Sequence, residues 1–157
     1  MDRNEVRGGH PHSTAKIGGH PIHPMLIPFP IVCFIGVLVT DIVFLSNHDA
    51  GWATASRYLL AIGLVMAALA AVAGLTDFMG DDRIRGSSDA LKHMLANVTA
   101  VVLEIVNFFV RLNNNDAIGK MGVYLSVIVV LILVYSGWKG GDLVYRHGIG
   151  VHDSPNV

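Results

Sequence analysis

Four apolar stretches separated by short polar segments dominate the chain, namely Met25–Leu45, Tyr58–Thr76, Met94–Val110 and Met121–Trp138. A hydrocarbon core of roughly 30 Å is crossed by about 20 mostly apolar residues, because a helix rises about 1.5 Å per residue. The second and fourth stretches hold no charged residue, whereas the first holds Asp41 and the third holds Glu104. The pattern therefore predicts four transmembrane helices.

Composition supports a lipid environment. The 157 residues are 52% hydrophobic and 15% charged, against about 25% charged residues in soluble domains. The net charge of −1 provides no global field that favours nucleic acid, and we expect no nucleic-acid partner. Cys33 is the only cysteine, so an intrachain disulfide is excluded. The polar first 24 residues lack the pattern of a cleaved secretory signal, so we interpret the first apolar stretch as a retained span.

Short connections between the spans predict an all-α membrane protein, an antiparallel up-down bundle of four transmembrane helices. We expect a flexible Gly/His/Pro-containing arm over residues 1–18, a transmembrane domain over 19–151 and a tail over 152–157. The expected spans are about 25–45, 58–77, 93–111 and 120–139, and the first interhelical loop is Asn47–Ser56. Pro28 and Pro30 predict a kinked or delayed start of the first helix. Small residues in the second span favour close helix packing, internally or against a partner in a homo- or hetero-oligomer.

Lysine and arginine placement predicts the orientation, because cytoplasmic loops carry an excess of these residues. If the N-terminus is inside, eight basic residues lie on the cytoplasmic side and three lie opposite. The eight are Arg3, Arg7, Lys16, Arg83, Arg85, Lys92, Lys139 and Arg146, and the three are Arg57, Arg111 and Lys120. We therefore expect both termini in the cytoplasm.

Four histidines stand at the ends of the spans that this topology brings to one face, namely His20, His23, His93 and His147. Neutral imidazole is the commonest protein ligand for metals. Asp77 lies at the same face and is expected to orient a ring or to act as a ligand itself. Interfacial histidines are also tolerated simply as polar residues at a membrane edge, so both interpretations stay open.

A polar stripe runs along the third span. At about 100° per residue its members fall within an arc of about 80°; they are His93, Asn97, Glu104, Asn107 and Arg111. Because charges inside a membrane normally face the bundle interior, the stripe is expected to point inward, either as hydrogen-bonding contacts between helices or as a proton or ion path. Asp41 and Arg111 should reach similar depth and form an ion pair. Glu104 is then the remaining charge at mid-depth, protonated by desolvation.

Several motifs carry a family resemblance. They are His20-Pro-Ile-His23-Pro-Met-Leu-Ile-Pro-Phe-Pro-Ile31, Gly74-Leu-Thr-Asp77, His93-Met-Leu-Ala-Asn97 and the segment from Ser136 to Val151. Together they resemble the bacterial membrane family catalogued as domain of unknown function 2231, over residues 19–151. The resemblance implies a four-span protein of the bacterial inner membrane and implies no particular activity.

The sequence is compatible with three functions. The first is a b-type haem protein that passes electrons within the membrane, to quinone or another redox partner, with His93 and His147 as the preferred axial pair. In it His20 and His23 complete a second ligand set or hydrogen-bond the first, and Asp77 and Asn97 belong to the same site. Arg146, Arg83 or Arg85 neutralises the propionates. The second is binding or transport of Zn, Fe, Cu or Ni by His20, His23, His93 and His147. The third is a non-catalytic membrane subunit or scaffold. In each we expect an electron carrier or binding protein rather than a stand-alone catalyst.

Overall fold

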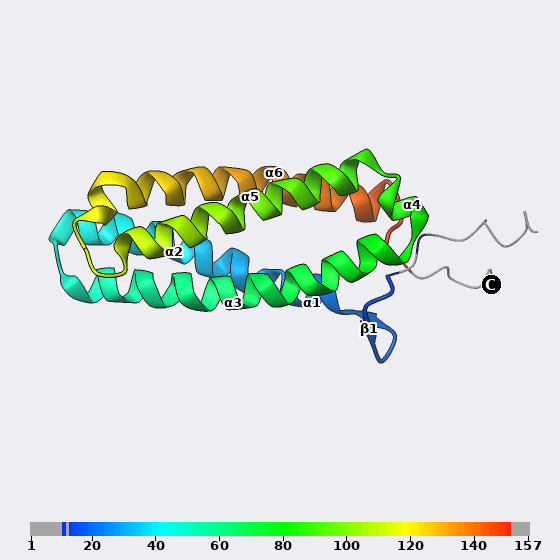
Figure 1. The fold of residues 1–157 in the computed structure, drawn as a ribbon, viewed down its shortest axis with the longest axis horizontal. Coiled ribbons are helices and arrows are strands. Elements are labelled where there is room, and N and C mark those ends of the chain that lie inside the picture. Colours follow the sequence, from blue (N-terminus) through cyan, green and yellow to red (C-terminus); the bar gives the residue numbers. More distant parts are fainter. Residues whose placement is uncertain (1–10, 12, 152–157) are drawn as a thin grey trace, which may run out of the picture.

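The computed structural model describes residues 11 and 13–151, and four long helical units lie side by side along its long axis (Figure 1). In chain order the helices are α1 (Ile22–Leu26), α2 (Pro28–Asn47), α3 (Ala50–Gly80), α4 (Asp82–Arg85), α5 (Ser88–Arg111), the π-helical turn η2 (Ile118–Gly122) and α6 (Val123–Tyr145). The units α1–α2, α3, α5 and η2–α6 are each long and apolar enough to cross a membrane. The predicted four-helix bundle is confirmed.

Two helical hairpins make up the bundle. Helix α2 packs along α3, α5 packs along α6, and the hairpins meet where α2 contacts α6 and α3 contacts α5. One core cluster takes a side chain from each helix: Phe34, Ala67, Ala100 and Val129. At Gly63 in α3 a Cβ atom would lie 2.6 Å from Phe34 Cε1, so only glycine admits this ring. Small residues of the second span therefore serve packing inside the bundle.

The sides of the bundle expose large apolar residues, whereas Asp41, Glu104 and Arg111 within the spans are fully buried. Large apolar side chains are exposed on every long helix, among them Val32 (68%), Val72 (68%), Val102 (52%) and Leu131 (64%). Exposed apolar surface of this extent marks contact with a membrane rather than with water. The chain is therefore a multi-pass membrane protein in contact with a lipid bilayer.

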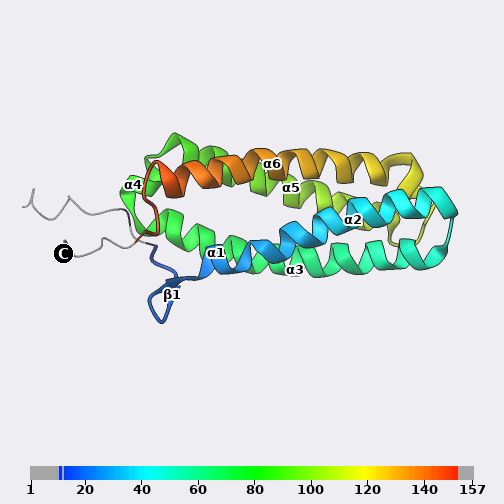
Figure 2. The same ribbon diagram turned by 180° about the vertical axis from the view of Figure 1, so that it is seen from behind.

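Prolines divide the first span as expected. Helix α1 ends at Leu26, Ile27 separates the two helices, and Pro28 is the first residue of α2. Proline fits this position because the first helical residues have no intrahelical partner for an N–H group. Figure 2 shows α1 leading into α2, which lies between α3 and α6. The break places His23 of α1 beside α3.

The connection between α2 and α3 is shorter than the predicted loop Asn47–Ser56. Helix α2 extends to Asn47 and α3 begins at Ala50, so only His48 and Asp49 lie between the helices. The Asp49 side chain caps α3 by accepting a hydrogen bond from the Gly51 N–H group. Thr54 and Ser56 of the predicted loop lie within α3, where Thr54 donates to the Ala50 carbonyl and Ser56 donates to Asp41 of α2.

Part of the predicted arm is held against the bundle. Strands β1 (Lys16–Ile17) and β2 (His20–Pro21) form a hairpin, whose turn uses Gly18 and Gly19 at φ 57° and 84°, a conformation that favours glycine. The Gly150 N–H group donates to the Pro11 carbonyl, so both ends of the described chain meet at the same end of the bundle. Residues 1–10 and 12 of the arm and the tail 152–157 lie outside the described residues.

Candidate functional site

The first hairpin holds His23 against α3. Its Nδ1 atom lies 2.8 Å from the Ala70 carbonyl oxygen. Because a carbonyl oxygen only accepts, Nδ1 is the donor in this contact, and Nε2 is the ring nitrogen that is left to bind a ligand. The ring lies over Gly74, where a Cβ atom would be 2.9 Å from His23 Nδ1 and Cε1. Gly74 thus makes the space in which the imidazole is oriented.

The second hairpin holds His93 in the same way against α6. His93 Nδ1 lies 2.9 Å from the Ser136 carbonyl oxygen, and a Cβ atom at Gly140 would lie 3.1 Å from His93 Cε1. Asn97, one turn further along α5, donates to His93 Nε2 at 3.1 Å and to the His93 carbonyl at 2.9 Å. The His93 lone pair is therefore held by a neutral amide.

These contacts repeat between the two hairpins. In each, a histidine of the first helix donates to a carbonyl of the second helix, and its ring lies on the glycine four residues further on. Three pairs of residues stand 70 positions apart in the chain, namely His23 and His93, Asp41 and Arg111, and Ser56 and Ser126. The hairpins therefore bring equivalent positions together across the bundle at both of its ends.

His23 and His93 form the histidine pair of this structure. Their ring centroids are 6.3 Å apart and their planes are perpendicular. We expected His93 and His147 to be the pair, but His147 lies elsewhere: its Nε2 is 3.2 Å from Asp89 Oδ2, and its side chain is 43% exposed. His20 is exposed in β2. Of the four histidines, the fold thus brings together one from each hairpin.

Asp77 and Arg146, which the sequence assigned to the histidine site, bond to other residues in the structure. Asp77 Oδ1 accepts hydrogen bonds from Ser13 Oγ at 2.9 Å, Thr14 N at 2.7 Å and Ala15 N at 2.7 Å. The Asp77 carboxylate therefore holds the arm against α3, which is a structural role. Arg146 pairs with Asp142 one helical turn earlier at 3.1 Å and is 71% exposed.

Sequence reasoning missed the groups that orient the rings, namely the Ala70 and Ser136 carbonyls and the two glycines. A signal was present in the spacing, because Ala70 and Gly74 stand four residues apart, as do Ser136 and Gly140. Among residues 11 and 13–151, no group of three or more His, Cys, Asp or Glu side chains is arranged to hold a metal ion. The described histidine site therefore offers two protein ligands.

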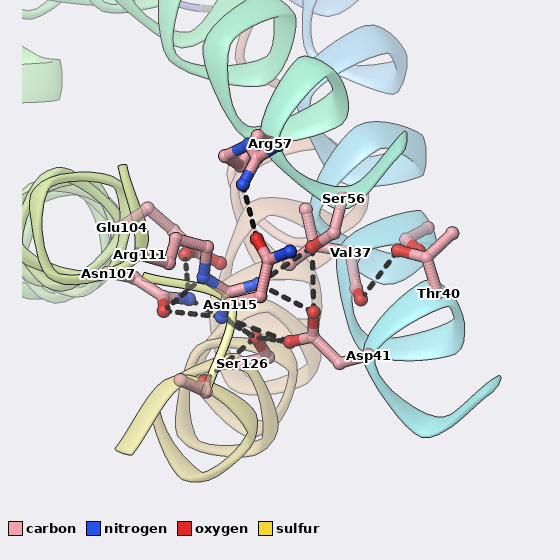
Figure 3. A network of polar contacts seen from close by, with 12 residues as sticks. Val37, Thr40, Asp41, Ser56, Arg57, Glu104, Asn107, Arg111, Asn115 and Ser126 are labelled. Carbon is pink, nitrogen blue, oxygen red and sulfur yellow. Dashed lines mark hydrogen bonds and ion pairs between the residues drawn. The ribbon is translucent and has the colours of Figure 1, made fainter. Parts of the chain in front are cut away.

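A second polar cluster lies toward the other end of the bundle, and we call it the buried network (Figure 3). Its side chains are fully buried: Asp41, Ser56, Glu104, Asn107, Arg111 and Ser126. Arg111 binds Asp41 through Nη1–Oδ1 at 2.5 Å and Nη2–Oδ2 at 3.0 Å, which confirms the predicted ion pair. At Gly122 a Cβ atom would lie 2.5 Å from Arg111 Nη2, so this glycine admits the guanidinium. The inward direction of the third-span stripe is also confirmed.

Fold and site together define a class: a multi-pass membrane protein of four spanning helices, with a histidine pair toward one end and a buried ionic network toward the other. The chain matches the family model described as Predicted membrane protein (DUF2231) over residues 19–153. It belongs to this family, as its opening and closing motifs indicated. No curated protein and no solved structure matches the chain.

Proposed function

We propose that this protein binds a b-type haem and carries electrons within the membrane, with His23 and His93 as the two axial ligands. One observation carries the proposal. Two imidazoles from different hairpins lie with their centroids 6.3 Å apart, and each donates from Nδ1 to a backbone carbonyl. A hydrogen bond of this kind sets the tautomer and ring orientation of metal-ligating histidines.

The separation of the rings is compatible with a metal between them. Metal–imidazole bonds measure roughly 2 Å, so two imidazole nitrogens on opposite sides of one ion lie about 4 Å apart. Adding roughly 1 Å from each nitrogen to the centre of its ring gives a centroid separation of about 6 Å. The observed 6.3 Å agrees with that figure.

The number of ligands favours haem over a bare metal ion. A porphyrin supplies four nitrogens, so two histidines complete the iron of an electron-transfer haem. A Zn site takes three or four protein ligands, and the described residues contain no such group. The alternative of Zn, Fe, Cu or Ni binding or transport therefore has less support from this geometry.

The surrounding residues have defined tasks in this proposal. The carbonyls of Ala70 and Ser136 orient the rings, and the Asn97 amide donates to His93 Nε2, the nitrogen that would bind the ligand. A haem held by His23 and His93 would supply one-electron transfer. A carrier of this kind exchanges electrons with quinone or a redox partner. The inner-membrane location, with this end of the bundle in contact with the cytoplasm, completes the proposal.

Absorption spectroscopy tests the proposal. The full-length protein, purified in nanodiscs and incubated with haem b, should show a Soret band that shifts on reduction with dithionite. His23→Ala and His93→Ala should each abolish the low-spin spectrum. His20→Ala and His147→Ala are the matched controls and should retain it, because neither side chain belongs to the pair.

The outcomes separate the ligand assignment from the function. If His147→Ala loses the spectrum and His23→Ala keeps it, the axial assignment is wrong but the haem proposal stands. If the unmodified protein takes up no haem, the haem proposal is wrong. Elemental analysis of the same sample then distinguishes a bare metal site from a non-catalytic subunit or scaffold.

A further inference from the structure

Glu104 differs from the other members of the buried network because half of its carboxyl group has no partner. Its Oε2 atom accepts a hydrogen bond from Asn107 Nδ2 at 2.8 Å. Its Oε1 atom makes none, and among residues 11 and 13–151 it is the only buried side-chain nitrogen or oxygen in that position. The residue is 0% exposed, so bulk water does not supply the missing bond.

The positive charge of the network is already neutralised by another residue. Arg111 uses Nη1 and Nη2 to bind both oxygens of Asp41, and its Nε and Nη2 also donate to Asn107 Oδ1. The charged groups of the network are Asp41 from α2 and Glu104 and Arg111 from α5. Helices α3 and α6 contribute only hydroxyl groups, those of Ser56 and Ser126. With Glu104 ionised, the network would hold one uncompensated negative charge.

A single bond from a neutral amide does not compensate a carboxylate inside a membrane, where an unpaired charge is expensive. One bound cation removes the cost. A metal cation needs several ligands, and among residues 11 and 13–151 no group of three or more His, Cys, Asp or Glu side chains is arranged to hold one. A proton needs only the carboxylate itself.

We propose that Glu104 is an exchangeable proton-binding site in the membrane interior. The carboxylate takes a proton from hydronium, which leaves as water, and the O–H bond of a neutral carboxylic acid forms at Oε1. Glu104 stands on α5 eleven residues beyond His93, or roughly 16 Å along the helix axis. The site is thus separate from the histidine pair, and the proposal does not depend on haem.

The chain contains only two glutamates, Glu5 and Glu104, which permits a direct measurement. Glutamate labelled with ¹³C at the side-chain carboxyl gives two resonances in the full-length protein in nanodiscs. Glu5→Gln removes one and so identifies the Glu104 resonance without any change in the network. At neutral pH the Glu104 carbon should resonate at the position of a protonated acid, and it should show a deuterium isotope shift after transfer to D₂O.

Two results would overturn the proposal. A Glu104 resonance at the ionised position at neutral pH means that no proton is bound. A protonated resonance without an isotope shift after prolonged exchange means that the proton is trapped.

Two variants serve as controls. Glu104→Gln should abolish the resonance and keep the Asn107 hydrogen bond, because the Gln carbonyl replaces Oε2 as the acceptor. Asp116→Asn, which neutralises an exposed carboxyl in the loop before η2, should leave the Glu104 resonance unchanged.

Discussion

At the histidine end of the bundle, His23 and His93 each use one nitrogen to bond a backbone carbonyl. At the network end, by contrast, Asp41 and Arg111 bond to each other and to the serines of both hairpins. Both pairs stand at equivalent positions of the two hairpins. Opposite charges satisfy each other, whereas two imidazoles that both donate through Nδ1 form no hydrogen bond to each other and keep Nε2 as an acceptor. The Asp41–Arg111 pair is therefore closed on itself, whereas the His23–His93 pair is the one that we propose as a ligand site.

The largest effect is expected from breaking the ion pair. Arg111→Leu leaves the buried Asp41 without its counter-charge, and loss of one partner of a buried pair costs about 3–5 kcal/mol. A hydrogen bond between neutral side chains in a membrane is worth only about 0.6 kcal/mol. Reversible unfolding in mixed micelles measures the difference in free energy of unfolding between Arg111→Leu and the unmodified protein.

The double variant Asp41→Leu/Arg111→Leu is the control for this measurement. It removes both charges and should recover more than half of the lost free energy of unfolding. A loss below about 1 kcal/mol in the single variant would show that Asp41 does not depend on Arg111, against the buried-pair expectation.

The second largest effect is expected from a methyl group at either glycine beneath the histidine rings, which should weaken ligand binding. In Gly74→Ala the Cβ atom would lie 2.9 Å from the His23 ring, so the ring must move. We expect the affinity for haem b to fall at least about tenfold, which corresponds to about 1.4 kcal/mol. Gly140→Ala should act in the same direction but less strongly, because its contact with His93 is 3.1 Å. Titration with haem b followed at the Soret band gives both affinities.

Gly137→Ala is the matched control on α6, because a Cβ atom at Gly137 meets nothing within 4 Å. Its affinity for haem b should equal that of the unmodified protein. Equal losses in Gly137→Ala and Gly74→Ala would mean that helix flexibility, rather than the space under the ring, controls binding.

Release of the His93 lone pair should have a smaller effect of opposite sign. Asn97→Ala removes the amide that donates to Nε2, so the ligand no longer competes with a hydrogen bond worth about 1 kcal/mol. The affinity for haem b should rise about fivefold. Weaker binding in this variant would show instead that Asn97 contacts the ligand directly.

The smallest effect is expected outside both clusters. His147→Gln removes the contact with Asp89, but His147 is 43% exposed. Exposed pairs contribute about 0–1 kcal/mol. The free energy of unfolding should therefore change by less than about 1 kcal/mol, and the haem spectrum should be unchanged. A lost spectrum would restore His147 to the ligand set.

The fold was largely predictable because apolar length alone decides which segments cross a membrane. The four spans and the inward direction of Glu104, Asn107 and Arg111 follow from hydrophobicity and helical period. The Asp41–Arg111 pair followed from equal depth in antiparallel spans. The start of α3 was missed, because Ser56 is polar in sequence but bonds Asp41 inside the bundle.

The site was predictable only as a set of histidines at one end. Hydrophobic pattern places His20, His23, His93 and His147 near one face but does not determine how each helix is rotated or which helices are neighbours. The break between α1 and α2 positions His23 beside Ala70, while the last turn of α6 directs His147 to Asp89. Asp77 was expected at a metal site, and only the folded arm shows its bonds to residues 13–15.

By itself the sequence determined that the chain enters lipid, where it crosses, and which charged residues avoid the lipid, since each depends on the transfer free energy of single segments. Tertiary structure decided which of the polar residues meet. Within each hairpin, glycines such as Gly63 and Gly122 make room for Phe34 and Arg111. Between the hairpins, pairing depends on how α2 packs against α6 and α3 against α5. Docking of the hairpins pairs Asp41 with Arg111. It also places His23 beside His93, each ring oriented by a backbone carbonyl.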